Sequence, residues 1–292
     1  MKGSVRQVAV IGAGTMGRGI AQACAVAGWD TRLTDMRPEA PAAALAAIGD
    51  TLAAGVARQK LTPEAREQAL SRLTAERSFL AACQDADLVI EAVFEDIDIK
   101  RAVFRQAVEV AAPGALYATN TSSIAVSSIA RGFAHPSRLL GLHFFNPVHL
   151  MRLVEVVVHD GNDDRAKSDA LAVVAALGKE PIVVKDSPGF ASSRLGVVLG
   201  LEAMRMVEQG VASPADIDRA MELGYNHPMG PLRLTDHVGL DVRLRIAEYL
   251  HRELGGSQYE PPAILRRLVT EGKLGKKTGE GFYKWEPQPG ER

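Results

Sequence analysis

A glycine-rich segment close to the N-terminus constrains the fold of this chain more than any other feature. Gly12, Gly14 and Gly17 form a GxGxxG pattern. The pattern stands between an apolar run of strand length, residues 7–12, and a helical segment that extends to Ala27. In such a loop one glycine makes a tight turn, one lets the backbone approach a pyrophosphate, and one allows close packing of helix on strand. We therefore predict a Rossmann-like unit that holds dinucleotide phosphates at the N-terminus of its first helix.

An acidic residue downstream narrows the choice of dinucleotide. Asp35 ends the second strand-like run, residues 30–35, at the distance from the loop where a carboxylate accepts a hydrogen bond from a ribose 2′-hydroxyl. Because this carboxylate repels a 2′-phosphate, we predict NAD, although Arg37 nearby is able to accommodate the phosphate of NADP. FAD uses the same loop, but no second flavin signature accompanies it here. The alternative is a tight turn with an incidental acidic residue.

Strand-like and helical segments alternate through much of the chain. Further apolar runs of strand length stand between longer helical patterns, at residues 88–93, 115–121, 139–145, 153–159 and 181–186. Such alternation is typical of an α/β unit with a largely parallel sheet. Beyond them only helical patterns remain, at residues 189–209, 214–222, 233–252 and 261–271. We therefore predict an α/β NAD-binding domain at residues 1–186 and a smaller all-helical domain at residues 187–292.

The composition argues against several classes of protein. A formal net charge of −1 gives no electrostatic attraction for nucleic acid or for an anionic membrane. The apolar helical segments carry charges such as Asp50, Arg194 and Glu202, so we predict a soluble protein without a membrane span. Cys24 and Cys83 stand outside any CxxC or Cys/His cluster. We therefore predict no metal site, no disulfide scaffold and a reduced, cytoplasmic setting.

Two strand-like runs in the middle of the chain bring candidate catalytic residues together. Residues 139–145 and 153–159 are joined by a short segment, and a hairpin centred on His149 puts His143 directly opposite Glu155. Cross-strand partners have Cβ atoms about 4.5–5.5 Å apart, which allows the two side chains to hydrogen-bond. A histidine held by a carboxylate can act as a general base, as the oxidation of an alcohol requires. The alternative is a structural pair on a sheet face.

Longer motifs resemble those of one known family. They are IGAGTMGRGIAQ (residues 11–22), NTSS (120–123), GLHFFNPVHLMRLVEV (141–156), KDSPGF (185–190), HPMGPLRLTDHVGLD (227–241) and GKLGKKTGEGFYKW (272–285). Together they are similar to motifs of the NAD-dependent 3-hydroxyacyl-CoA dehydrogenases of fatty-acid β-oxidation, including 3-hydroxybutyryl-CoA dehydrogenases. The resemblance covers nearly the whole chain. It implies a stand-alone dehydrogenase of (S)-3-hydroxyacyl-CoA whose helical domain also supplies the interface of a homodimer.

The resemblance also implies roles for individual residues. His143 is the general base, Glu155 orients it, and Ser122 hydrogen-bonds the substrate oxygen. Besides the glycine loop, the positions where the family contacts NAD are Asp35, Glu95, Lys100, Ser122, Asn146 and Lys277. Glu95 and Lys100 are also compatible with an ordinary ion pair on a helix surface, and Lys277 with a loop cation.

One position departs from the family pattern, and the contacts with the acyl carrier are less distinct. Ser193 stands where the family usually has an asparagine, in the helix after the PGF motif. Serine offers one hydroxyl and a shorter reach, so either a water completes the contact or the substrate carbonyl is held differently. A helix at about residues 50–60 carries Thr51, Arg58 and Lys60, near where the family meets CoA. Cations suit a phosphate-rich carrier, although a solvated helix face has the same composition.

The predicted activity is reversible NAD-dependent oxidation of (S)-3-hydroxyacyl-CoA to 3-oxoacyl-CoA. Two alternatives stay open. The first is a dehydrogenase of a free hydroxy acid, of the gulonate or carnitine type. The second is a non-catalytic NAD-binding protein, which Ser193 alone favours and the pair of His143 and Glu155 opposes.

Overall fold

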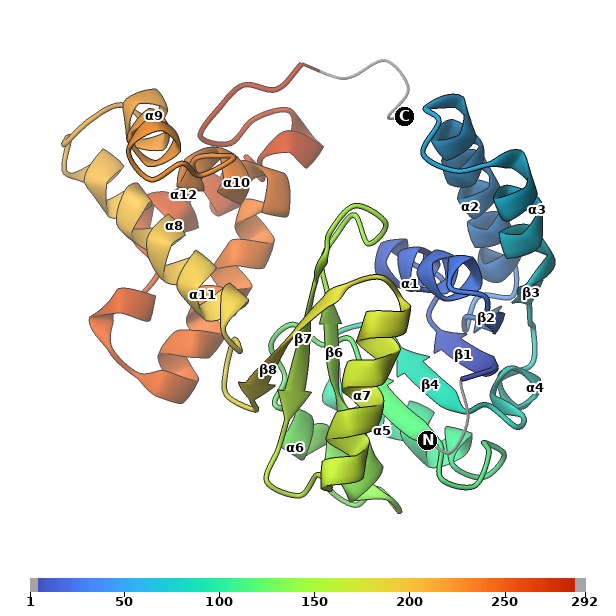
Figure 1. The fold of residues 1–292 in the computed structure, drawn as a ribbon. Coiled ribbons are helices and arrows are strands. Elements are labelled where there is room, and N and C mark those ends of the chain that lie inside the picture. Colours follow the sequence, from blue (N-terminus) through green and yellow to red (C-terminus); the bar gives the residue numbers. More distant parts are fainter. Residues whose placement is uncertain (1–4, 287–292) are drawn as a thin grey trace. The chain divides into compact units, whose positions relative to one another are not determined.

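The computed structural model describes residues 5–286, and Figure 1 shows its fold. The chain divides into two compact units, Met1–Asp186 and Ser187–Arg292. The first unit contains a sheet with helices, and the second is built from helices. The α/β unit and the helical unit predicted from the sequence are thus both present.

The N-terminal unit holds an eight-stranded sheet of order β3-β2-β1-β4-β5-β6-β7-β8. Its strands are β1 (Gln7–Ile11), β2 (Asp30–Thr34), β3 (Leu73–Ala75), β4 (Leu88–Glu91), β5 (Leu116–Thr119), β6 (Leu139–Phe144), β7 (Leu153–Val158) and β8 (Glu180–Lys185). Neighbouring strands are parallel except β6 and β7, which are antiparallel. The sequence pattern misses only β3, because its three residues are too few to show an alternation.

Helices alternate with these strands. They are α1 (Thr15–Val26), α2 (Ala40–Ala57), α3 (Pro63–Ser71), α4 (Phe79–Cys83), α5 (Ile97–Ala107), α6 (Val126–Ala130) and α7 (Asp164–Ala176). Apolar side chains of the strands and of α1, α2 and α7 share one core, in which Ile20, Leu33, Ile90 and Val173 are almost completely buried. This core holds the ends of the strands, where the polar residues of the candidate site lie, in fixed positions.

Helix α2 is the one helix in the described part of the chain that is long and apolar enough to cross a membrane by length and composition. Of its 18 residues, 22% are buried. The buried residues include Ala44, Ile48 and Leu52, which lie at helical spacing and belong to the core of the N-terminal unit. A single apolar stripe of this kind is typical of a helix packed on the surface of a folded unit.

The C-terminal unit consists of packed helices. They are α8 (Ser192–Glu208), α9 (Pro214–Gly224), α10 (Pro231–Val238), α11 (Leu240–Leu254) and α12 (Ala263–Thr270), around a core that includes Val197, Leu201, Met204 and Leu265. The single helix expected at residues 233–252 is wrong, because Gly239 separates α10 from α11. Gly239 has φ +99°, in the region that favours glycine, and a helix cannot continue through it.

Candidate active site

The three glycines of the N-terminal loop each meet a different steric demand. Gly12 has φ +107°, and a Cβ there would lie 2.4 Å from the backbone oxygen of Ala92. A Cβ on Gly17 would lie 1.7 Å from the backbone oxygen of Gly12. Gly14 has no atom within 4 Å of its Cβ position, so the backbone is open there. The loop therefore makes the turn and the close helix packing expected of a phosphate-binding loop, with free space at its middle glycine.

A cavity of about 570 Å³ lies beside this loop, and Gly14, Asp35 and Phe94 are among the residues that line it. Asp35 Oδ2 accepts a hydrogen bond from Ala13 N at 2.8 Å, and Oδ1 accepts one from Arg37 N at 3.0 Å. Partial burial works to raise the pKa of Asp35, but these bonds and the Arg37 guanidinium hold it below its usual value. An ionised carboxylate beside open phosphate-binding backbone fits a dinucleotide with a free ribose hydroxyl.

His143 lies on β6 directly opposite Glu155 on β7, in the register that the hairpin predicts. Its Nδ1 is 2.7 Å from Glu155 Oε2, and its Nε2 is 3.1 Å from Ser122 Oγ. His143 is 5% exposed and Glu155 is completely buried. A carboxylate carries no hydrogen to donate, so Nδ1 is the nitrogen that donates to Glu155; in the neutral imidazole Nε2 is then the acceptor, to which Ser122 donates.

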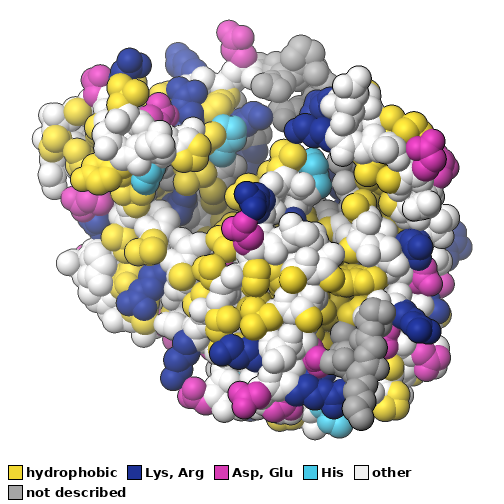
Figure 2. Space-filling model, viewed as in Figure 1, with side chains coloured by type: hydrophobic (Ala, Val, Ile, Leu, Met, Phe, Trp, Pro, Cys, Tyr) yellow, Lys and Arg dark blue, Asp and Glu magenta, His cyan; other side chains and the backbone are white. Residues whose placement is uncertain are grey.

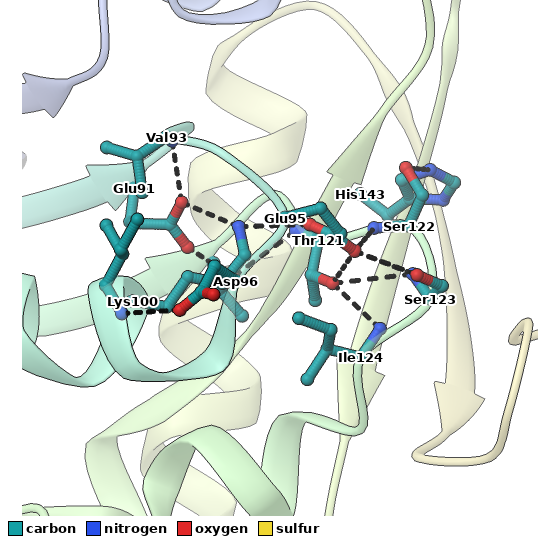
Figure 3. A network of polar contacts seen from close by, with 12 residues as sticks. Glu91, Val93, Glu95, Asp96, Lys100, Thr121, Ser122, Ser123, Ile124 and His143 are labelled. Carbon is teal, nitrogen blue, oxygen red and sulfur yellow. Dashed lines mark hydrogen bonds and ion pairs between the residues drawn. The ribbon is translucent and has the colours of Figure 1, made fainter. Parts of the chain in front are cut away.

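The loop that carries Ser122 is held by one carboxylate, as Figure 3 shows. Glu95 Oε1 accepts hydrogen bonds from the hydroxyl of Thr121, from the backbone N–H of Ser122 and Ser123, both at 3.2 Å, and from Ser123 Oγ at 3.0 Å. Burial works to raise the pKa of Glu95, but the Lys100 charge and these hydrogen bonds lower it overall. Glu95 thereby fixes the backbone from which the Ser122 hydroxyl reaches His143.

Lys100 links Glu95 to a second carboxylate that is buried. Its Nζ is 2.8 Å from Glu91 Oε1 and 3.1 Å from Glu95 Oε2, and its side chain is 1% exposed (Figure 3). Glu91 also accepts hydrogen bonds from Thr119 Oγ1 at 2.6 Å and Val93 N at 2.7 Å. Burial raises the pKa of Glu91 even though Lys100 opposes this shift. Glu95 and Lys100 are therefore not an ion pair on a helix surface, and a contact between Lys100 and NAD stays a prediction.

Sequence reasoning did not single out Glu91. It is the last residue of β4, completely buried, and the charge ends an otherwise apolar run. A charge at a buried strand position needs a partner, and Lys100, one helical turn into α5, supplies it. The sequence feature that indicates this buried charge is the acidic residue within the apolar run LVIEAV, residues 88–93.

Three further predicted residues lie in other settings. Asn146 is exposed in the turn after β6. Ser193 is half-buried in the first turn of α8 in the C-terminal unit. Lys277, in the same unit, forms an ion pair with Asp241 and is 46% exposed. Their proposed contacts with NAD or substrate stay predictions.

The residues predicted to meet the acyl carrier lie at the end of α2 and just beyond it. Thr51 donates to Ala47 O within the helix, at 2.9 Å. The helix expected to run to residue 60 ends at Ala57, because Gln59 has φ +57° and turns the chain, so Arg58 and Lys60 lie outside it. Both are exposed.

The positive charges at this turn affect the pKa of His149, in the segment between β6 and β7. Burial, followed by the charges of Lys179, Arg58 and Lys60, lowers the pKa of His149. Lys179 also donates to the backbone oxygen of Met151, at 2.7 Å, in the turn between β6 and β7. Cations from two segments, Lys179 on one and Arg58 and Lys60 on the other, thus act on a histidine in the turn between β6 and β7. Among residues 5–286, no group of three or more His, Cys, Asp or Glu residues could hold a metal ion.

Comparisons with known proteins agree with this arrangement. Residues 7–187 match the family described as "3-hydroxyacyl-CoA dehydrogenase, NAD binding domain", and residues 189–285 match "3-hydroxyacyl-CoA dehydrogenase, C-terminal domain". The chain belongs to the 3-hydroxyacyl-CoA dehydrogenase family. It is therefore an oxidoreductase that uses NAD, which confirms the prediction made from the glycine loop and Asp35.

Individual members of the 3-hydroxyacyl-CoA dehydrogenase family match over nearly their whole length. The chain is 41% identical over 282 residues to the "Probable 3-hydroxybutyryl-CoA dehydrogenase" of Bacillus subtilis, covering 97% of this chain and 98% of that protein. It is 39% identical over 288 residues to the "Hydroxyacyl-coenzyme A dehydrogenase, mitochondrial" of Homo sapiens, covering 96% and 91%. The solved structure of "(S)-3-hydroxybutyryl-CoA dehydrogenase PaaH1 from Ralstonia eutropha" matches with a TM-score of 0.93 at 38% identity, covering 97% of this chain and 100% of the other.

Proposed function

We propose that this chain catalyses the reversible oxidation of (S)-3-hydroxyacyl-CoA to 3-oxoacyl-CoA with His143 as the general base. The observation that carries the proposal is the alignment of Glu155, His143 and Ser122, in which a buried carboxylate leaves Nε2 as the proton acceptor. NAD⁺, when bound, accepts the hydride that leaves C3 of the substrate. His143 Nε2 takes the hydroxyl proton, Glu155 stabilises the imidazolium that forms, and the Ser122 hydroxyl orients the substrate oxygen.

The residues proposed to hold NAD surround the phosphate-binding loop. The backbone at Gly14 and the N-terminus of α1 take the pyrophosphate, and Asp35 takes the adenosine ribose. Glu95, paired with Lys100, fixes the backbone of the loop that carries Ser122. This supports the proposal that Glu95 and Lys100 lie near the nicotinamide of NAD. Asn146 and Lys277 complete the proposed set of contacts.

We assign the CoA moiety to the cations around the hairpin tip. Besides burial, the charges of Lys179, Arg58 and Lys60 lower the pKa of His149, so all three cations act on the region around that side chain. Phosphate groups bind clusters of this kind by charge-assisted hydrogen bonds. Thr51, on the last turns of α2, is proposed to contact the same carrier.

Consumption of NADH with acetoacetyl-CoA as substrate tests the proposal. His143→Gln should lower kcat about 10²- to 10⁴-fold, the usual contribution of a general base, and leave the Kd of NADH nearly unchanged. His135→Gln, an exposed histidine of the same unit, is the matched control. Full activity of the His143 variant would refute the assignment.

Two other outcomes separate the alternatives. Faster turnover of gulonate or carnitine than of any acyl-CoA would identify a dehydrogenase of free hydroxy acids. Tight binding of NADH without turnover of any acyl-CoA would identify a non-catalytic NAD-binding protein.

We also propose that the chain forms a homodimer through its helical unit. Leu195, Leu223 and Tyr225 are 72%, 72% and 75% exposed, and Figure 2 shows hydrophobic side chains on the displayed face of this unit. Exposed apolar side chains of this size are typical of surfaces that bind another protein. A sedimentation mass of one chain at all concentrations would contradict the dimer.

A cytoplasmic location is proposed as well. Cys24 and Cys83 are both buried as free thiols, which suits a reducing compartment. Cell fractionation tests this directly, and recovery of the protein with an oxidising compartment would contradict it.

A further inference from the structure

Glu91, the last residue of β4, is a carboxylate to which the proposed function gives no role. It is completely buried, and it accepts hydrogen bonds from Lys100 Nζ at 2.8 Å, Thr119 Oγ1 at 2.6 Å and Val93 N at 2.7 Å. The Thr119 oxygen itself accepts a hydrogen bond from Thr121 N at 3.3 Å, so its hydroxyl hydrogen is directed to Glu91. Although burial raises the pKa of Glu91, each of these three donors stabilises the ionised carboxylate.

The charges around Glu91 do not cancel. Lys100 Nζ is shared between Glu91 Oε1 at 2.8 Å and Glu95 Oε2 at 3.1 Å, so one ammonium faces two carboxylates and one negative charge is left over (Figure 3). The side chains of Glu91 and Lys100 are 0% and 1% exposed. Because water screens buried charges much less than exposed ones, the excess charge of this network acts on its surroundings at longer range than a surface charge does.

The network of Glu91, Lys100 and Glu95 adjoins the residues proposed to take the substrate proton. Glu95 Oε1 accepts a hydrogen bond from Ser122 N at 3.2 Å, and Ser122 Oγ is 3.1 Å from His143 Nε2. The nicotinamide of a bound cofactor has to lie close to these groups, because hydride passes to it from the carbon that bears the substrate hydroxyl. The excess negative charge therefore acts on the nicotinamide.

The same network adjoins the glycine loop. The backbone oxygen of Ala92, the residue after Glu91, is 2.4 Å from the Cβ position of Gly12, and Ala92 N donates to Ile11 O at 2.8 Å. Dinucleotides bind at the carboxyl ends of parallel strands, with the pyrophosphate on this loop. A cofactor that reaches from the loop to Ser122 thus passes the end of β4, where Glu91 lies.

The two oxidation states of the cofactor differ in the charge that the network meets. NAD⁺, when bound, carries a positive charge on its nicotinamide, which NADH lacks. In the proposed oxidation hydride leaves C3 for the ring and the hydroxyl proton goes to His143 Nε2, so the positive charge is transferred to the imidazole, where Glu155 stabilises it. A negative charge near the ring therefore favours the cofactor before the transfer and not after it.

We propose that Glu91 is a specificity-determining residue whose buried charge favours binding of NAD⁺ relative to NADH. This role rests on the proposed function and specifies how the cofactor site distinguishes the two oxidation states. Since Glu91 is completely buried, it acts through its charge and not by contact with the cofactor.

Equilibrium binding of the two cofactors, measured by calorimetry, tests this role. Glu91→Gln keeps the size of the side chain and removes the charge, while Lys100 stays paired with Glu95. We expect the ratio of the Kd of NAD⁺ to the Kd of NADH to rise on the order of tenfold, as for one charge about 10 Å away at an effective dielectric constant of about 20. A loosened loop would instead weaken both cofactors alike. An unchanged ratio would overturn the proposal.

Matched variants separate charge from structure. Thr119→Val removes a hydrogen bond from Glu91 but leaves its charge, so the ratio should stay unchanged even if both Kd values rise. Asp98→Asn, on α5 with a side chain that is 86% exposed, removes a charge that water screens and should also leave the ratio unchanged. A rise in the ratio for Thr119→Val equal to that for Glu91→Gln would overturn the proposal.

A double variant supplies a second test of the charge. Glu91→Gln combined with Lys100→Met leaves Glu95 as the one charge of the network, so the excess is again negative and the ratio should return toward the wild-type value. A ratio that stays as high as in Glu91→Gln would overturn the proposal. These measurements need no turnover, so failure of the wild type to reduce any 3-oxoacyl-CoA would refute the proposed function separately.

Discussion

Replacing Lys100 with methionine should destabilise the N-terminal unit and disturb the loop that carries Ser122. The side chain of Lys100 is 1% exposed, and its ammonium is the cation shared by Glu91 and Glu95. Methionine fills similar space without the charge, so completely buried Glu91 loses its counter-ion while keeping the hydrogen bonds from Thr119 and Val93.

The magnitude follows from the burial of both partners. Removing one member of a buried ion pair costs about 3–5 kcal/mol, because it leaves the other charge uncompensated. For a unit of this size, each kcal/mol lowers Tm by about 2–4 °C, so we expect a fall of about 6–20 °C. Differential scanning calorimetry measures it, and Lys167→Met, an exposed lysine of α7, is the control, expected to change stability by less than about 0.5 kcal/mol.

The pH dependence identifies the responsible charge. Burial already raises the pKa of Glu91, and loss of the ammonium should raise it further. A carboxyl group whose pKa is higher in the folded than in the unfolded state contributes stability below its unfolded pKa. That contribution is lost as the pH rises through the folded pKa. The deficit of Lys100→Met against the wild type should therefore shrink as the pH falls.

A second substitution tests whether the uncompensated charge of Glu91 causes the loss of stability. Glu91→Gln removes the uncompensated charge, so the double variant should recover most of the stability that Lys100→Met loses. A loss below about 1 kcal/mol in the single variant, a deficit that does not change with pH, or no recovery in the double variant would each contradict a buried ion pair as the cause.

Three other substitutions test the cofactor loop and the proposed catalytic role of the β6–β7 hairpin. Gly17→Ala should abolish NADH binding in a fluorescence titration, because its Cβ would lie 1.7 Å from the Gly12 oxygen. Asp35→Ala should weaken NADH binding and reduce the preference for NADH over NADPH, which kcat/KM with each cofactor measures. Glu155→Gln should lower kcat with little change in the Kd of NADH, since the imidazolium loses its buried carboxylate; an unchanged kcat would contradict this role.

The parts of the fold that depend on local pattern were predictable from the sequence. The register of the hairpin follows from symmetry about His149, which places His143 opposite Glu155. The glycine loop was predictable from its GxGxxG spacing, although the close contact that excludes a side chain at Gly12 comes from Ala92, in a distant segment of the chain. The break at Gly239 was not predicted, because helical periodicity continues across it and only the backbone conformation reveals the turn.

Contacts between residues that are far apart in the sequence could not be predicted from the sequence pattern. Glu91 pairs with Lys100 only because α5 returns over the end of β4, and Thr119 approaches from a third element. Arg243 occupies a core position of α11, and its guanidinium lies beside Gly196 and Gly200 of α8. Whether a charge is buried and paired depends on the tertiary structure. The sequence therefore shows which residues are charged but not what surrounds them.

The division at Asp186 places the residues of the candidate site in two separate units of the chain. The residues proposed to move the proton and to hold its loop, from Glu91 to Glu155, all belong to the first unit. Ser193 and Lys277, whose contacts with substrate and NAD are proposed, belong to the second. Substitutions confined to the helical unit therefore leave every residue of the proposed proton transfer unchanged, which makes this unit the safer part of the chain to vary.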